Sequence, residues 1–206
     1  MKSRTGVVAI TALTVALLAG CTPVVPTPGP ASHTPSPTAS GAASPDGSPT
    51  PTTLPADCRS LIGTASTSSF ATFALNDPAM TQVPASGVVT PSQPAAGATP
   101  EDIVQAATER YCLWRDPQAD VTNLELSVSR VEPTVVSALI TKLAGQGYIC
   151  TAPHEGRQCQ SLSKDAQYGV DIADTVFARD GFVIRISQAN VVTHDLVGSI
   201  VASIWN

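Results

Sequence analysis

A tract crowded with proline divides the chain into a part that cannot fold and a part that can. Ten of the 18 prolines lie in residues 22–56, and most other residues there are Ser, Thr, Ala or Gly. Such a segment cannot bury enough apolar surface to offset its ordering entropy. Frequent proline favours the extended polyproline II conformation, so the segment can reach on the order of 100 Å. We therefore predict a disordered tether over residues 22–56 and one folded domain over residues 57–206.

The first 20 residues have the three zones of an export signal. Lys2 and Arg4 give a positive start, and residues 5–17 are apolar or small without a charge. This run is shorter than the roughly 20 residues that a helix needs to span a bilayer. A charged start, a short apolar run and small residues at its end are typical of a secretory signal, which is removed. We therefore predict a signal peptide over residues 1–20.

The apolar run ends in Leu18-Ala19-Gly20-Cys21, which resembles the lipobox of bacterial lipoproteins. The resemblance implies that a diacylglyceryl group is attached to the sulfur of Cys21 and that the chain is cut just before this residue. Each buried methylene contributes about 0.8 kcal/mol, so two acyl chains hold a protein stably at a membrane. With its Pro/Ser/Thr tether, the chain is similar to small lipoproteins of Gram-positive bacteria with high-GC genomes. That likeness implies a lipid-anchored protein on the extracytoplasmic face of the cell membrane.

Four more cysteines lie in the predicted domain: Cys58, Cys112, Cys150 and Cys159. An even number in an exported domain indicates two disulfides, and four cysteines allow three pairings. Cys150 and Cys159 flank a Pro-His-Glu-Gly turn between two strand-like runs, which places them opposite each other across a hairpin. This arrangement favours the pairing of Cys150 with Cys159 and leaves Cys58 for Cys112. A zinc site is disfavoured, because the sequence has no paired C-x-x-C motif.

Two segments carry the same amphipathic helical pattern. In residues 133–145, Pro133 suits the first helical position and Gly145 the end, and in residues 193–205 Thr193 is a good N-cap. The apolar residues of both segments follow the spacing i, i+1, i+4, i+5, i+8, which forms a single stripe on an α-helix. We therefore predict two helices that each bury one face.

The residues before each helix match as well. Apolar side chains alternate in "NLELSVSRV" at residues 123–131 and in "FVIRISQAN" at residues 182–190, which is the period of a strand with one buried face. Another strand-like run, closed by an Arg-Asp turn, precedes each of them. A unit of strand, turn, strand and helix therefore occurs twice. We predict two ββα repeats that form a pseudo-twofold pair.

Shorter signals complete the prediction of an α+β domain with a mostly antiparallel sheet covered by helices. Thr99 is an N-cap signal before Pro100 at the start of a short helix, and "FATFALN" at residues 70–76 can form a strand. Residues 77–98 are rich in Pro, Ser and Gly, so we expect a long loop. Within this loop, Val83 and the pair Val88-Val89 can pair briefly with a strand edge.

The charge of the chain argues against a nucleic-acid partner. The sequence has 16 acidic and 11 basic residues, a net charge of −5, whereas a surface that binds phosphates is basic. The three histidines show no metal-ligand spacing and no motif requires a cofactor, so we expect none. The pattern favours a non-enzymatic binding or interaction module in the cell envelope. Its partner would be an envelope protein or a small ligand.

Two alternative functions remain open. Ser161-Leu162-Ser163-Lys164 fits the S-x-x-K pattern of serine enzymes that act on cell-wall peptides, although no S-D-N or K-T-G motif accompanies it. One alternative is therefore an envelope hydrolase, and the other is a carrier of a small apolar ligand held between sheet and helices. Because function is often carried by loops, the expected binding positions are residues 77–98 and the hairpin tip with His154 and Glu155.

Overall fold

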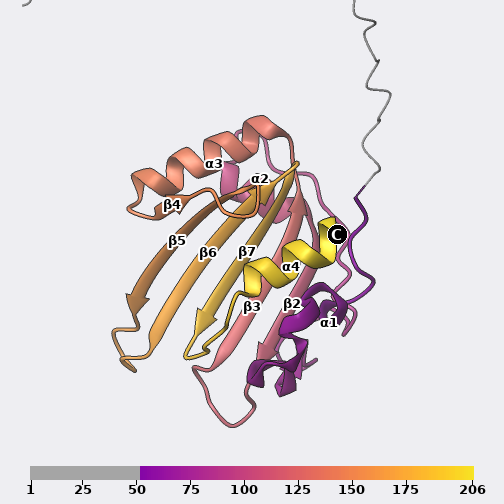
Figure 1. The fold of residues 1–206 in the computed structure, drawn as a ribbon, viewed down its shortest axis with the longest axis vertical. Helices are drawn as coiled ribbons and strands as arrows, with labels where there is room; N and C mark the ends of the chain where they lie inside the picture. The colour runs from indigo at the N-terminus through magenta and orange to yellow at the C-terminus, as the bar shows by residue number, and fades with distance from the viewer. Residues whose placement is uncertain (1–51) are drawn as a thin grey trace, which may run out of the picture. The chain divides into compact units, whose positions relative to one another are not determined.

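The computed structural model describes residues 52–206 (Figure 1). The predicted signal peptide, Cys21 and residues 22–51 of the predicted tether lie outside the described residues. Residues 52–206 form one seven-stranded antiparallel sheet with four α-helices and two 3₁₀-helices. The predicted α+β class is therefore confirmed. Within this part of the chain, no helix is long and apolar enough to cross a bilayer.

The sheet order is β1-β2-β3-β7-β6-β5-β4. The strands are β1 (Ala74–Leu75), β2 (Thr108–Arg115), β3 (Asn123–Arg130), β4 (Ile149–Thr151), β5 (Arg157–Lys164), β6 (Asp171–Arg179) and β7 (Phe182–Ala189). The helices are α1 (Cys58–Leu61), η1 (Gly63–Thr67), η2 (Ser69–Thr72), α2 (Pro100–Ala106), α3 (Pro133–Gly145) and α4 (Leu196–Trp205).

The central strand β7 shows why both faces of the sheet carry helices. Successive side chains of a strand point to opposite faces. Phe182, Ile184 and Ile186 therefore point to one face and Val183 to the other, and all four side chains are buried. Helix α4 packs on the first face, which we name the α4 face, and α2 and α3 pack on the second, the α3 face. The sheet thus separates two hydrophobic cores.

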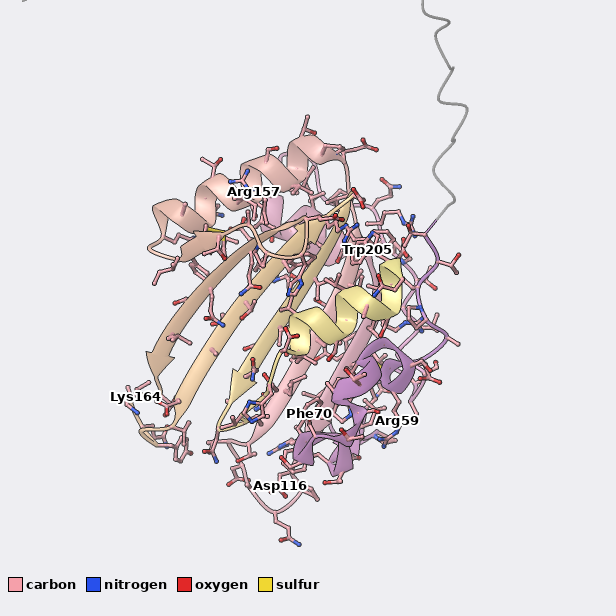
Figure 2. All side chains as sticks on the ribbon, in the orientation of Figure 1. Arg59, Phe70, Asp116, Arg157, Lys164 and Trp205 are labelled. Atoms are coloured by element: carbon pink, nitrogen blue, oxygen red, sulfur yellow. A yellow bond between two sulfur atoms is a disulfide. The ribbon has the colours of Figure 1, made fainter. Side chains whose placement is uncertain are left out.

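The larger core lies on the α4 face. Trp114 of β2 and Phe177 of β6 are fully buried there, together with Ile200 of α4 and Phe70 of η2. The rings of Phe70 and Trp114 meet edge to face with their centroids 5.6 Å apart. Trp205, at the end of α4, packs partly buried against the same core (Figure 2). This face therefore buries the largest side chains of the domain.

The smaller core covers only part of the α3 face. Leu139 of α3 and Val104 of α2 pack there against Val176 of β6 and Val183 of β7. The next residues of β7 on this face are Arg185 and Ser187, which are exposed and half-buried. Antiparallel sheets often leave one face in water, and here the change occurs along a single strand. The rest of the α3 face is consequently open and polar.

Both predicted ββα units are present, as β2-β3-α3 and β6-β7-α4, and their hairpins pair through β3 and β7. The predicted pseudo-twofold arrangement is wrong, because α3 and α4 lie on opposite faces of the sheet. A twofold axis that relates antiparallel neighbours runs along the sheet normal, so it would keep both helices on one face. The connections differ in length: two residues join β3 to α3, whereas six join β7 to α4. The longer connection lets α4 reach the other face.

Both favoured disulfide pairings are confirmed. Cys58 of α1 is bonded to Cys112 of β2, with 54 residues of sequence separation and a Cα–Cα distance of 5.8 Å. Cys150 is bonded to Cys159, its directly paired neighbour across the β4–β5 ladder, with a separation of 9 residues. The first bridge fastens the N-terminal segment to the sheet. The second holds the short edge strand β4 in place.

The helix limits follow the capping signals, with one exception. The helix predicted over residues 133–145 has those limits in α3, and Thr99 forms a capping box with Asp102 at the start of α2. The predicted N-cap Thr193 is wrong: Asp195 caps α4 by accepting a hydrogen bond from the Gly198 amide. Asp195 has a left-handed backbone with φ of 46°, which Asp tolerates better than most residues. The chain can therefore turn sharply into α4 two residues later than predicted.

The N-terminal part of the domain differs most from its prediction. Residues 70–76 form a strand only at β1, because η2 turns inward and buries Phe70. The loop over residues 77–98 runs beside β2 and bridges to it at Val88, as predicted. The guanidinium of buried Arg110 donates hydrogen bonds to the carbonyls of Pro55 at 2.7 Å and Ser86 at 3.1 Å. A single side chain thus joins β2 to two irregular segments.

Candidate functional site

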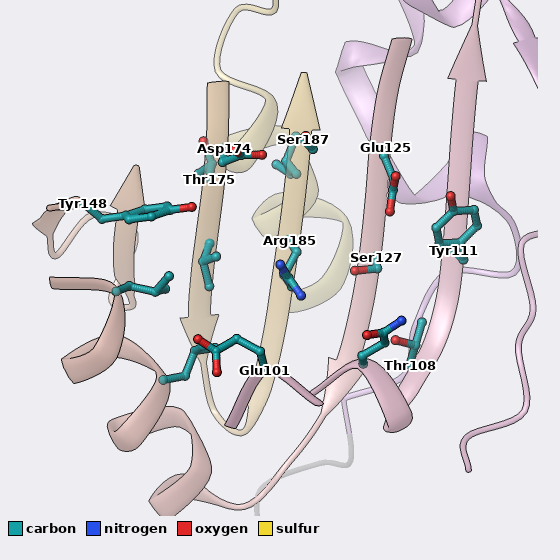
Figure 3. A pocket seen from close by; sticks show the side chains of 15 residues that line it. Glu101, Thr108, Tyr111, Glu125, Ser127, Tyr148, Asp174, Thr175, Arg185 and Ser187 are labelled. Carbon is teal, nitrogen blue, oxygen red and sulfur yellow. The ribbon is translucent and has the colours of Figure 1, made fainter. Parts of the chain in front are cut away.

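A hollow of about 310 Å³ lies on the open part of the α3 face, and we name it the Arg185 hollow (Figure 3). Its floor is formed by β2, β3, β7 and β6, and its walls come from α2, α3 and Tyr148 just before β4. Most of the lining side chains are polar. They are Glu101, Gln105, Thr108, Tyr111, Glu125, Ser127, Leu139, Leu143, Tyr148, Asp174, Thr175, Val176, Arg185, Ile186 and Ser187.

The strand register places the charged side chains of the floor. Arg185 on β7 pairs directly with Ser127 on β3 and Val176 on β6. Two residues further along β7, Ser187 pairs with Glu125 and with Asp174. Directly paired residues point to the same face of a sheet. The floor therefore holds one arginine in one row and two carboxylates in the next.

Arg185 is a cation without a bonded partner at the middle of the sheet. Its side chain is exposed, and in the described part of the chain it forms no hydrogen bond and no ion pair. Figure 3 shows the guanidinium standing over the floor of the hollow, between the β6 and β3 side chains. Its donors are therefore free for a ligand, and a guanidinium binds a carboxylate or phosphate in a fixed two-pronged geometry.

Tyr111 lies near Glu125, one of the two carboxylates. Burial, followed by the nearby charge of Glu125, raises the pKa of Tyr111 to about 12. The phenol therefore stays protonated at neutral pH and adds no second negative charge beside the carboxylate. Figure 3 shows the Tyr111 ring and the Glu125 carboxylate on neighbouring strands of the floor.

Tyr148 and Glu101 belong to the walls of the hollow (Figure 3). Burial, followed by the charge of Asp174, raises the pKa of Tyr148, so this hydroxyl is also protonated at neutral pH. Burial is the largest single effect and raises the pKa of the Glu101 carboxyl, but the hydrogen bond and the charge of Lys142, together with hydrogen bonds from the backbone and Thr99, lower this pKa overall. The Lys142 Nζ lies 2.7 Å from the Glu101 carboxylate and links α3 to α2. Glu101 is thus neutralised by Lys142, whereas Asp174 and Arg185 keep unpaired charges.

The predicted binding residues His154 and Glu155 lie elsewhere, in the β4–β5 turn, where both have positive φ values. Glu155 forms an ion pair of 2.7 Å with Arg179, and His154 Nε2 lies 3.8 Å from Asp195 Oδ1. A second hollow of about 210 Å³, lined by His154, Asp195 and several glutamine and threonine side chains, lies beside the start of α4. It belongs to the α4 face, so it is separate from the Arg185 hollow. A binding role for His154 and Glu155 stays a prediction.

The S-x-x-K segment does not form a serine–lysine pair. Ser161 and Lys164 both lie in β5, three residues apart, so their side chains point to opposite faces of the strand. Lys164 forms an ion pair with Asp171 across the β5–β6 ladder. The Ser161 hydroxyl and the Lys164 amine therefore do not meet, although a hydrolase of this type would need that contact.

The sequence contained only a weak signal for the Arg185 hollow. Arg185 stands between Ile184 and Ile186 in an alternating strand, which predicts an outward side chain and nothing more. Its neighbours come from five other elements, so no local motif unites them. Among residues 52–206, no group of three His, Cys, Asp or Glu side chains is arranged to hold a metal ion.

No known protein family matches the sequence of this chain, and no curated protein matches it.

Proposed function

We propose that this chain is a membrane-anchored extracytoplasmic lipoprotein whose folded domain is a non-enzymatic binding module of the cell envelope. Acyl chains on Cys21 would hold it at the membrane, and the tether would lift the domain away from the surface. The support for this placement is the lipobox sequence before Cys21 and the two disulfides, which persist in oxidising compartments.

The proposed binding site is the Arg185 hollow, and its ligand is a small polar molecule that carries a carboxylate or another anionic group. One observation carries this proposal: Arg185 presents an unpaired guanidinium inside a concave polar surface. Small-molecule sites are concave and contain a few convergent polar groups. Within the described residues, no histidine or cysteine lines the hollow, so its serines lack the usual activating base. This composition favours binding over hydrolysis.

Native mass spectrometry of the chain purified from its own membranes tests the binding role. We expect a non-covalent adduct of small mass in the wild type and its loss in Arg185→Gln. Arg157→Gln is the matched control, because Arg157 is another exposed arginine without a hydrogen bond or ion pair in the described part of the chain. An adduct that persists in Arg185→Gln, or the loss of the adduct in Arg157→Gln, contradicts the proposed site.

Membrane fractionation tests the anchor separately. We expect the Cys21→Ala variant to leave the membrane fraction, because it lacks the sulfur that would carry the acyl chains. Unchanged retention of the variant at the membrane would overturn the lipid anchor and leave the binding proposal to its own test.

A further inference from the structure

We infer that the ligand of the Arg185 hollow is a zwitterion, a short peptide about two residues long with a free amino and a free carboxyl end. This inference rests on the proposed binding function and deepens it. It follows from the signs, spacing and surroundings of the unpaired charges on the floor.

The floor carries unpaired charges of both signs. Arg185 has a carboxylate on each side in the next row, Glu125 toward β3 and Asp174 toward β6. Diagonal neighbours on a sheet face lie roughly 7–8 Å apart. Arg185 forms an ion pair with neither carboxylate, so the opposite charges share the hollow without neutralising each other. Figure 3 shows the carboxylates of Asp174 and Glu125 on either side of Ser187.

This arrangement selects against ligands of a single charge. A simple anion on Arg185 would be repelled by two carboxylates, and a simple cation over Ser187 would be repelled by the guanidinium. A molecule with one group of each sign meets an opposite charge at both ends, and complementary charge patterns of this kind give specificity. The carboxyl group of the ligand would therefore bind Arg185, and its ammonium group would lie over Ser187 between Glu125 and Asp174.

The spacing of the two rows sets the length of the ligand. Arg185 and Ser187 are two residues apart on one strand, which corresponds to about 6.8 Å along the sheet. A chain of two residues spans at most about 7 Å, whereas one residue spans about half of that. A dipeptide can therefore place its ends on both rows without bending. A free amino acid is too short, and a tripeptide is too long.

The wall of the hollow suits an apolar side chain. Leu143 of α3 lines the hollow, and Figure 3 shows the ring of Tyr148 on the side of β6. Leu139 and Val176 also line the hollow and belong to the smaller core. The hydroxyl of Tyr148 is protonated at neutral pH, because burial and Asp174 raise its pKa, so it adds a donor and no negative charge. We therefore expect a dipeptide with an aliphatic residue to bind better than one with two acidic residues.

Isothermal titration calorimetry of the full chain in detergent micelles tests the inference with alanyl-leucine, its N-acetyl derivative and its C-terminal amide. We expect alanyl-leucine to bind, and each blocked form to bind at least tenfold more weakly, because hydrogen bonds between charged groups are the stronger ones. Leucine alone and alanyl-leucyl-alanine should also bind more weakly. Equal binding of the N-acetyl form overturns the zwitterion, and equal binding of leucine overturns the length.

Variants assign the two ends. Arg185→Gln should abolish the preference for the free carboxylate over the amide, and the double change Glu125→Gln with Asp174→Asn should abolish the preference for the free amine. Arg157→Gln should keep both preferences. If the N-acetyl form binds as tightly as alanyl-leucine and depends on Arg185, this inference fails and the proposed function stands. If no compound of the set binds in a manner that depends on Arg185, this inference fails, and the adduct measured by native mass spectrometry decides the proposed function by itself.

Discussion

Removal of the two disulfides one at a time should destabilise the domain unequally. Cys58–Cys112 closes a loop with a sequence separation of 54, and Cys150–Cys159 closes one with a separation of 9. A cross-link stabilises mainly by restricting the unfolded chain, and the restriction grows with the logarithm of loop length. The loop-entropy relation gives about 4.2 kcal/mol for the long loop and about 2.7 kcal/mol for the short one. The expected difference is therefore about 1.5 kcal/mol.

The matched variants are Cys58→Ala with Cys112→Ala, and Cys150→Ala with Cys159→Ala. Three of these four side chains are fully buried, and only Cys150 is partly exposed. The same side-chain volume is thus removed in each variant, and loop length is the main difference between them. Both bridges together approach the net stability of a whole domain, so reduction of the wild type should unfold it at 25 °C.

Urea unfolding without a reducing agent, followed by the fluorescence of buried Trp114, measures the effect. The midpoint of the Cys58/Cys112 variant should lie about 1 M below that of the Cys150/Cys159 variant, given a typical denaturant slope of 1–3 kcal/mol per molar. The argument from loop length is refuted if removing Cys150–Cys159 lowers the free energy of unfolding as much as removing Cys58–Cys112 does. A reduced wild type that stays folded would show that both bridges are weaker than calculated.

Three further predictions concern single positions. A Cβ on Gly156 would collide with the Phe177 ring and the Ala178 carbonyl, so Gly156→Ala should cost about 1–3 kcal/mol in urea unfolding, whereas Gly145→Ala, which meets open space, should cost nothing. Tyr111 should ionise near pH 12 in an ultraviolet titration, compared with Tyr111→Phe; because this folded pKa is raised, its stabilising contribution is present below pH 10 and is lost as the pH rises toward 12. An ordinary tyrosine titration near pH 10 would contradict the burial of Tyr111 beside the charge of Glu125. Glu101→Gln should lower the free energy of unfolding by about 0.5 kcal/mol at pH 7, since its pair with Lys142 is partly exposed. The folded pKa of Glu101 is lowered, so its contribution is present above pH 4.5 and vanishes as the pH falls through the lowered value; the same loss at pH 3 as at pH 7 would disprove it.

Local patterns predicted the elements of the fold better than their positions in space. The α3 limits follow from Pro133 and Gly145, and the Cys150–Cys159 bridge follows from a hairpin that a short turn already implies. Thr193 failed as an N-cap because a second capping residue, Asp195, stands two positions later and tolerates the left-handed backbone. When two residues are similarly good N-caps, tertiary packing decides which one starts the helix, and the local sequence does not contain that information.

The site could not be predicted from the sequence, because it depends on a long-range pairing. Glu125 and Arg185 share a surface only because β3 pairs with β7, a contact between residues about 60 positions apart. On the α3 face, Val183 is buried and Arg185 is exposed because α3 packs over the first residue and not over the second. The predicted pair His154 and Glu155 came from the rule that loops carry function. The Arg185 hollow instead has a floor of regular strands.

That floor has a consequence for how the domain would receive a ligand. Strand β7 is hydrogen-bonded on both sides along its whole length, and its first three residues are buried between the two cores. Amide protons beneath Arg185 should therefore exchange with solvent only when the entire domain opens, whereas those of the seven-residue helix α2 should exchange through local fraying. Recognition would then take place on a preformed template, with adjustment confined to the rim.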